Sequence, residues 1–310
     1  MKTSGYDLKF TVASRTLFSR KLCIVHWDAF GKATSSNFPQ LLPSPDGQPI
    51  DGYLVHSVEI AGAIEPTGDN NAYLLYVLQE YPRYITRFTG SFEDFLGTKS
   101  AKTRATLRKK VRNFAKAGEV DEVVWHTYST PDEIADFMKR AIPLAKRTYQ
   151  ARLFDGALPD SREFLEQSIQ SAENSSLKAY LLFLNGNAVA YLYAPIRDGA
   201  MIYAYLGYDE EVANLSPGTV LQFLVHESLF KEQSVLYFDF TEGDGAHKAL
   251  FATEQTRCCN ILYLKNTLEN RCLVGAHRRW NKSVEFLRDM AGKTKLKQRI
   301  KGALRKSPGH

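Results

Sequence analysis

Three carboxylates follow the apolar run SVLYFDF, and they are Asp239, Glu242 and Asp244. Ligands in open αβ sheets bind beyond the carboxyl ends of strands, so a carboxylate here can take a proton from a bound substrate. Glu242 is the first choice for such a base. Asp239 alternates with Phe238 and Phe240, which leaves a structural pairing open, and Asp244 also fits a solvated acidic turn.

A second group of polar residues lies around Ser216-Pro217-Gly218, between the run AMIYAYLGYD and a helical pattern. A strand, a glycine-bearing turn and a helix N-terminus form a place for an anion, because unpaired N–H groups and the positive helix end point at it. Gly218 would admit a phosphate to the backbone, and Ser216 and Thr219 carry hydroxyl donors. An ordinary helix start remains the alternative.

Further candidate side chains lie on either side of these groups. Lys248 is expected to neutralise a phosphate or an acceptor carboxylate, with a plain surface lysine as the alternative, and His247 is a possible proton carrier. Tyr149 and Arg152 follow a helix kinked at Pro143 and are expected to line a substrate site. The seven histidines show no H-x-x-x-H or H-E-x-x-H spacing, so no metal is expected.

The run from Ala179 to Leu264 predicts the elements that position these residues. AYLLFL and AVAYLYAPI flank Asn185-Gly186-Asn187, and Asn-Gly between apolar-alternating runs is the strongest local hairpin signal. A strand AMIYAYLGYD, a helix TVLQFLVHESLFKEQ and the strands SVLYFDF and RCCNILYLK follow. This order indicates an αβ unit that holds a cofactor.

Upstream, KLCIVHW, YLVHSVEIA, AYLLYVL and YITRF predict mixed β structure. Asp94–Ala117 is predicted to be one helix, with Thr98 or Ser100 as cap and Gly118 as stop. Thr130-Pro131-Asp132-Glu133 is a capping box that opens the next helix. The predicted domains are a β-rich lobe at 1–90, a catalytic-type domain at 91–266, and a helix with a basic tail at 267–310.

Composition limits the class of protein. Apolar residues make up 44% and charged residues 24% of the 310, as in soluble globular proteins. No apolar run approaches the ~20 residues of a membrane span, and no secretory signal is visible. The four cysteines fit reduced, buried thiols. We expect a cytoplasmic protein, with peripheral contact to the inner membrane surface left open.

Positive charge is concentrated in two segments. Residues 271–310 hold 12 lysines and arginines against 2 acidic residues, whereas the remainder holds 28 against 32. A second basic cluster spans Lys99–Lys116, with Leu107, Val111 and Phe114 on one helical face. Both segments suit an anionic surface, either membrane or RNA, and a merely solvated basic face is the alternative.

Four stretches resemble the GNAT superfamily of acyltransferases, in the branch of CelD-like acetyltransferases and Fem-type aminoacyltransferases. One is a basic helix in which Lys102, Arg104, Arg108 and Lys109 resemble the pattern Ser-x-Lys-x-x-Arg-x-x-Leu-Arg-Lys, with one residue fewer between Lys102 and Arg104. The others are NGNAVAYLY, YLGYDEEVANLSPGTVLQFLVHESL and YFDFTEGDGAHKALF. The resemblance covers roughly half of the chain, and residues 1–90 match only as a degenerate first GNAT-like lobe.

The resemblance implies an α/β (α+β) fold with a mixed, splayed sheet flanked by helices. Acetyl-CoA or another acyl-CoA would enter the splay, with its pantetheine along Leu206 and Gly207 and its pyrophosphate on the helix after Pro217. An amine acceptor, a small molecule or a sugar, would attack the thioester while Tyr208 donates to the departing sulfur. The loop carries a single glycine where the family pattern is Gln/Arg-x-x-Gly-x-Gly/Ala.

These features are therefore compatible with three functions. The first is N-acyl transfer from acyl-CoA to an amine. The second is Fem-type transfer from aminoacyl-tRNA, which the basic segments and the single-glycine loop favour. The third is a non-catalytic GNAT-like module that binds an anionic partner through residues 99–116 and 278–306.

Overall fold

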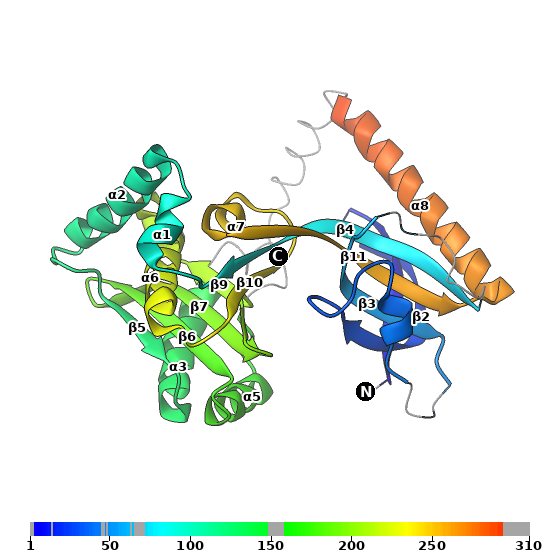
Figure 1. The fold of residues 1–310 in the computed structure, drawn as a ribbon, viewed down its shortest axis with the longest axis horizontal. Helices are drawn as coiled ribbons and strands as arrows, with labels where there is room; N and C mark the ends of the chain where they lie inside the picture. Colours follow the sequence, from blue (N-terminus) through cyan, green and yellow to red (C-terminus); the bar gives the residue numbers. More distant parts are fainter. Residues whose placement is uncertain are drawn as a thin grey trace, which may run out of the picture. The chain divides into compact units, whose positions relative to one another are not determined.

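The computed structural model describes residues 3–13, 15–44, 47, 49–62, 64, 72–147 and 158–293. The chain forms two compact units, residues 1–81 with 257–310 and residues 82–256. Two long strands, β4 (Tyr73–Arg87) and β11 (Glu254–Lys265), contribute residues to both units (Figure 1). The boundary between the units thus falls inside two strands, and a division at residues 90 and 266 stays a prediction.

The first unit is built on a sheet with the strand order β1-β2-β3-β11-β4. Strand β1 (Thr3–Val12) pairs antiparallel with β2 (Arg15–Asp28), which pairs parallel with β3 (Gly52–Glu59). A short 3₁₀ helix, η1 (Phe38–Leu41), lies in the loop between β2 and β3. The two strands predicted from AYLLYVL and YITRF are one continuous strand, β4, because Pro82 is accommodated within the strand.

The long helix α8 (Leu268–Lys293) also belongs to this unit and confirms the helix expected there. The Trp280 indole donates to the Thr11 carbonyl oxygen at 3.0 Å. His277 Nε2 donates to the Lys9 carbonyl oxygen at 3.1 Å, so its Nδ1 accepts from the Tyr76 hydroxyl at 2.7 Å. These bonds hold the first part of α8 against β1 and β4.

The second unit contains a mixed sheet with the order β4-β10-β8-β7-β6-β5. Its central hairpin pairs β6 (Leu177–Leu184) antiparallel with β7 (Asn187–Arg197). Asn185 and Gly186 both have positive φ, 50° and 77°, as the predicted Asn-Gly turn requires. The remaining strands are β5 (Trp125–Tyr128), β8 (Ala200–Ile202), β9 (Tyr205–Tyr208) and β10 (Tyr237–Glu242).

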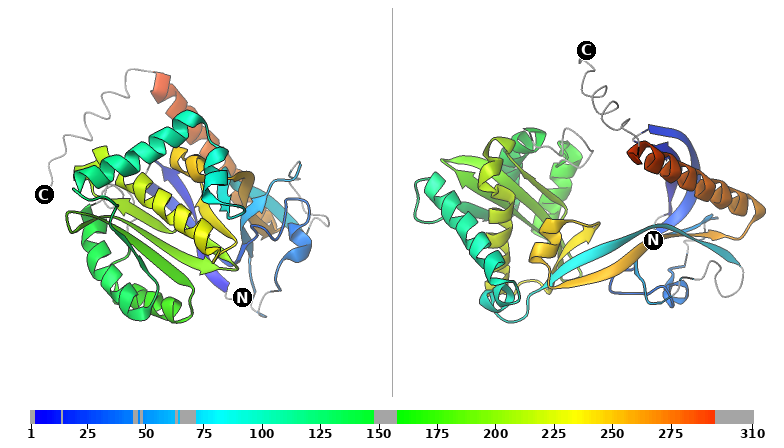
Figure 2. Two further views of the ribbon diagram at one scale, coloured as in Figure 1. Left: turned by 60° about the vertical axis from the view of Figure 1, so that its left-hand side comes forward. Right: turned by 90° about the horizontal axis from the view of Figure 1, so that it is seen from above.

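Helices cover both faces of this sheet. Tyr180 and Leu182 belong to the core beneath α1 (Phe92–Gly97), α2 (Ala101–Ala117) and α6 (Pro217–Glu232). Ala179 and Leu181, which alternate with them, belong to the core beneath α3 (Pro131–Arg147) and α5 (Arg162–Glu173). In Figure 2 the yellow α6 lies over the green strands.

The helix predicted over Asp94–Ala117 is two helices, α1 and α2, with a break at Thr98–Ser100. Ser91 caps α1 through a capping box with Asp94, and the Ser100 hydroxyl accepts from the Thr103 N–H to cap α2. A second capping residue inside the pattern therefore starts a new helix. Gly118 ends α2 as predicted, and the capping box at Thr130–Glu133 is confirmed.

The expectation of buried cysteines is only half right. Cys258 and Cys259 are buried in β11, whereas Cys23 and Cys272 are exposed, and all four are free thiols. Burial raises the pKa of the Cys259 thiol to about 12. Among the helices of the described chain, none has the length and apolar character needed to cross a membrane.

Candidate functional site

Two neighbouring chain segments diverge near the centre of the second unit's sheet. β8 pairs parallel with β10 from Ala200 to Ile202, and the Tyr203 N–H donates to the Asp239 carbonyl oxygen at 2.9 Å. Beyond Tyr203 the chain leaves β10, and β9 pairs antiparallel with β7. The run AMIYAYLGYD, predicted as one strand, is therefore two strands, β8 and β9. We call this divergence, residues 203–208 and 239–242, the fork.

Helix α6 begins beside β9. A Cβ at Gly218 would lie 3.3 Å from Tyr208 Cδ1 and 3.4 Å from Leu206 Cδ2, so this glycine lets the helix approach the strand closely. Ser216 adopts the left-handed conformation (φ 56°, ψ 48°) between the 3₁₀ helix η2 (Glu210–Leu215) and α6. Within the described residues, the side chains of Ser216 and Thr219 have no hydrogen-bond partner. Both hydroxyls are thus available at the helix N-terminus.

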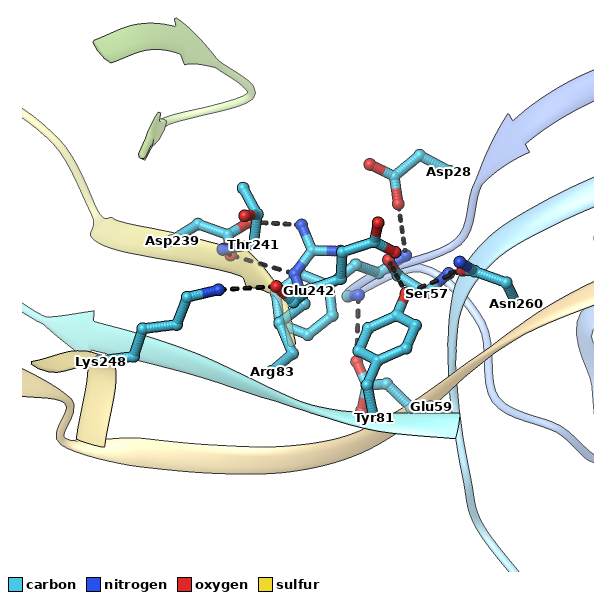
Figure 3. A network of polar contacts seen from close by, with 12 residues as sticks. Asp28, Ser57, Glu59, Tyr81, Arg83, Asp239, Thr241, Glu242, Lys248 and Asn260 are labelled. Carbon is cyan, nitrogen blue, oxygen red and sulfur yellow. Dashed lines mark hydrogen bonds and ion pairs between the residues drawn. The ribbon is translucent and has the colours of Figure 1, made fainter. Parts of the chain in front are cut away.

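The end of β10 holds a buried ion pair. Asp239 and Arg83 are 1% and 6% exposed. Arg83 Nε donates to Asp239 Oδ1 at 3.0 Å, and its Nη2 contacts Oδ2 (Figure 3). Asp239 Oδ1 also accepts from the Thr241 N–H at 2.8 Å, across an irregularity in the β4–β10 register where Thr241 has φ 60°. Asp239 therefore shapes the turn that precedes Glu242.

Lys248, on the short helix α7 (Ala246–Phe251), reaches back to the same strand end. Its Nζ donates to the Glu242 carbonyl oxygen at 2.6 Å, and the residue is 9% exposed (Figure 3). Burial lowers the pKa of the Lys248 ammonium, while the carboxylates of Asp239 and Glu242 oppose that shift. Lys248 is therefore not the plain surface lysine of the alternative reading.

His247, Tyr203 and Tyr84 also lie near the end of β10. The His247 ring lies 5.9 Å from the Tyr203 ring, and burial, with the charge of Lys248, lowers the pKa of this histidine. The Tyr84 hydroxyl donates to Asp244 Oδ1 at 2.8 Å, and that hydrogen bond raises the pKa of Tyr84. Asp244 thus accepts two hydrogen bonds, one from the Tyr84 hydroxyl and one from the Gly245 N–H.

The structure brings the sequence-predicted residues into two groups. Leu206 and Tyr208 lie against Gly218, at the β9 arm of the fork. Asp239, Glu242, Lys248 and their neighbour His247 lie at the end of β10. Tyr149 and Arg152 lie outside the described residues. Across the described part of the chain, no group of three or more His, Cys, Asp or Glu side chains is arranged to hold a metal ion.

Two residues at the fork, Arg83 and Tyr203, were not predicted from the sequence. Arg83 and Arg87 are the two charges in the apolar-rich segment YPRYITRF, and Asp239 is a lone charge in YFDF. Opposite charges in apolar strands are a signal for a buried pair. Tyr203 has no such signal, because its position at the divergence depends on where β8 leaves β10.

Residues 101–249 match a family model described as an acetyltransferase (GNAT) domain. The crystal structure of FemX is similar over 88% of this chain and 90% of that chain, with a TM-score of 0.51 and 11% identity. L-PGS from Bacillus licheniformis is similar over 88% of both chains, with a TM-score of 0.49 and 14% identity. No curated protein matches the chain.

The open mixed sheet with helices on both faces defines a GNAT-like fold, which FemX shares. The match over residues 101–249 identifies this part of the chain as a GNAT domain. The resemblance stated from the sequence is thereby confirmed.

Proposed function

We propose that the protein is an acyltransferase that moves an acyl group from a CoA thioester to an amine. The observation that carries this proposal is the fork. Within the described residues β9 pairs only with β7, so its other edge presents backbone N–H and C=O groups to the space beside β10. An extended pantetheine chain has amides that can hydrogen-bond such an edge, as a peptide does when it adds a strand.

The N-terminus of α6 supports an anchor for the phosphates of the donor. A helix of this length concentrates partial positive charge at its first turn, and Gly218 keeps that turn close to β9. Pro217 contributes no N–H, so the hydroxyls of Ser216 and Thr219 take a larger share of the donors. Acetyl-CoA is the first donor to test.

The proposed reaction needs one base and one acid. Glu242 removes the proton from the acceptor ammonium, and the free amine attacks the thioester carbon. The new C–N bond forms as the C–S bond breaks, Tyr208 protonates the departing thiolate, and Tyr208 regains its proton from the nitrogen of the new amide. Asp239 stays in its ion pair with Arg83 and positions Glu242. Holding both reactants in the fork supplies much of the rate by orientation.

The experiment measures the release of free CoA thiol from acetyl-CoA in the presence of a panel of small amines and amino sugars. Glu242→Gln is expected to lower turnover about 100-fold or more, while CoA affinity stays near that of the unmodified protein. Unchanged turnover at every pH would remove Glu242 from the mechanism. No thiol release from any acyl-CoA, in the unmodified protein, would contradict the CoA donor.

An aminoacyl-tRNA donor is the second candidate, and the surface of α2 favours it. Lys102, Lys109, Arg112 and Lys116 are exposed, and no described residue forms an ion pair with any of them. Their spacing places them along one side of the helix, which suits the phosphates of an RNA. Titration with acetyl-CoA against a charged tRNA separates the two donors.

A further inference from the structure

Gln222 is a buried polar side chain of α6 that the proposed reaction does not use. It is 2% exposed, and its Nε2 has no hydrogen-bond partner among the described residues. Buried amide groups in folded proteins are nearly always paired, because leaving one unpaired is costly. The unpaired Nε2 donor of Gln222 therefore needs a physical explanation.

The position of Gln222 follows from its neighbours on the helix. Residues four apart lie on one face, so Gly218, Gln222 and His226 form one stripe. At one end of the stripe, Gly218 faces Leu206 and Tyr208 of β9. At the other end, the His226 ring lies 5.0 Å from the Phe238 ring and 5.8 Å from the Phe240 ring, both in β10. Gln222 thus lies midway along the face of α6 that runs from β9 to β10.

The rest of this stripe is apolar or already committed. His226 Nδ1 donates to the Gln222 carbonyl oxygen at 2.8 Å, and its ring is enclosed by aromatic side chains. The Tyr203 ring also packs against Phe238 and Phe240, at 6.1 and 5.7 Å between centroids. One amide donor in an otherwise apolar surrounding matches a ligand that is mostly aliphatic with isolated amide groups.

We propose that Gln222 Nε2 donates a hydrogen bond to an amide carbonyl of the pantetheine arm of the acyl donor. This inference rests on the proposed function, because it assigns the part of the donor that enters the fork. Pantetheine is an aliphatic chain interrupted by two amides, so its amide carbonyl oxygens can accept the hydrogen bond that Gln222 Nε2 does not make to any described residue. Gln222 is then a specificity residue for pantetheine-bearing donors.

The test compares Gln222→Met with the unmodified full-length chain. Methionine keeps the length and volume of the side chain and removes the donor. Gln167→Met is the matched control, since Gln167 is exposed on α5, where it bonds Glu163. The probes are coenzyme A, pantetheine, and adenosine 3′,5′-bisphosphate, which lacks the pantetheine arm. The readouts are affinity by calorimetry and the melting temperature of the free protein.

Gln222→Met is expected to bind coenzyme A and pantetheine about five- to tenfold more weakly, with unchanged affinity for the bisphosphate. It is expected to melt at the same or a higher temperature, because the unpaired donor is gone. The control is expected to match the unmodified protein. Weaker binding of all three probes together with a lower melting temperature overturns the proposal, since Gln222 would then be structural.

Two other outcomes separate this proposal from the proposed function. If Gln222→Met binds coenzyme A as tightly as the unmodified chain, the role of Gln222 is wrong and the acyl-CoA donor stands. If the unmodified chain binds none of the three probes, both the role of Gln222 and the CoA donor are wrong.

Discussion

The three carboxylates at the end of β10 have different surroundings although they lie within six residues. Asp239 is buried against Arg83, Asp244 accepts from Tyr84, and Glu242 is on the exposed side of the strand end. A proton acceptor must be reachable by the substrate. At the scale of single residues this difference favours Glu242 as the proposed base and Asp239 as its proposed support.

The ion pair between Arg83 and Asp239 yields a prediction for stability. Asp239→Asn is expected to cost about 3–5 kcal/mol, because it leaves the Arg83 charge buried without compensation. Glu254→Gln breaks the exposed pair with Arg87 and is expected to cost about 0–1 kcal/mol. Thermal and urea unfolding measure both variants. Equal, small losses in the free energy of unfolding of the two variants would show that the buried pair stabilises the protein no more than the exposed pair does.

His226 predicts a pH dependence of stability. Burial lowers the pKa of His226 from its ordinary 6.5 to about 4 in the folded protein. In the window between these values the unfolded chain binds the proton and the folded chain does not, so stability is full above pH 6.5 and falls as the pH drops toward 4. The loss is on the order of 3 kcal/mol.

The variant His226→Phe checks this prediction, because it removes the titrating group and keeps an aromatic ring among its neighbours. Its melting temperature is expected to fall less between pH 6.5 and pH 4 than that of the unmodified protein. Identical pH profiles would assign the acid sensitivity to other groups.

At the scale of elements, the fork depends on β9 staying close to β7. Gly207 lies opposite Tyr191, and a Cβ on Gly207 would lie 2.5 Å from Tyr191 Cε1. Tyr191 is fully buried, so its ring has little room to move. Glycine at this position is what allows the two strands to pair at this register.

Gly207→Ala is therefore expected to destabilise the protein by about 1–3 kcal/mol and to weaken binding of coenzyme A. Gly97→Ala is the control, since no atom lies within 4 Å of its added Cβ. Melting temperature and calorimetric affinity are the measurements. A Gly207→Ala protein as stable as Gly97→Ala would mean that β7 and β9 shift to admit the methyl group.

At the scale of the whole molecule, charge is unevenly distributed, and α2 carries one of its basic segments. Replacing Lys102, Lys109 and Lys116 by glutamate is expected to weaken binding of tRNA and to reduce the salt dependence, the slope of log K on log salt, by about 2–3. The control replaces Lys139, Arg197 and Lys231, which are exposed on other elements. Filter binding at several salt concentrations measures the slope.

Equal losses in the two triple variants would indicate a general charge effect and no site on α2. Binding of both variants and the unmodified chain to anionic vesicles, with no binding to tRNA, would favour a membrane surface as the partner of α2.

Most elements of the second unit could be predicted from the sequence because their signals are local. The Asn185-Gly186 turn, the Ser100 cap and the capping box at Thr130 each act within a few residues. The break between α1 and α2 and the break between β8 and β9 were missed. In the second case the residues favour a strand throughout, and only the change of pairing partner divides it.

The amino-acid sequence alone determined the GNAT resemblance, the order of the central elements and the presence of carboxylates after β10, since motifs, periodicity and turn residues act along the chain. Only the tertiary structure decided that Asp239 is held by Arg83, that Lys248 contacts the Glu242 carbonyl oxygen, and that the buried Gln222 Nε2 has no partner among the described residues. These contacts join segments that are far apart in the sequence, so the burial of each side chain and its partner are set only when the chain has folded.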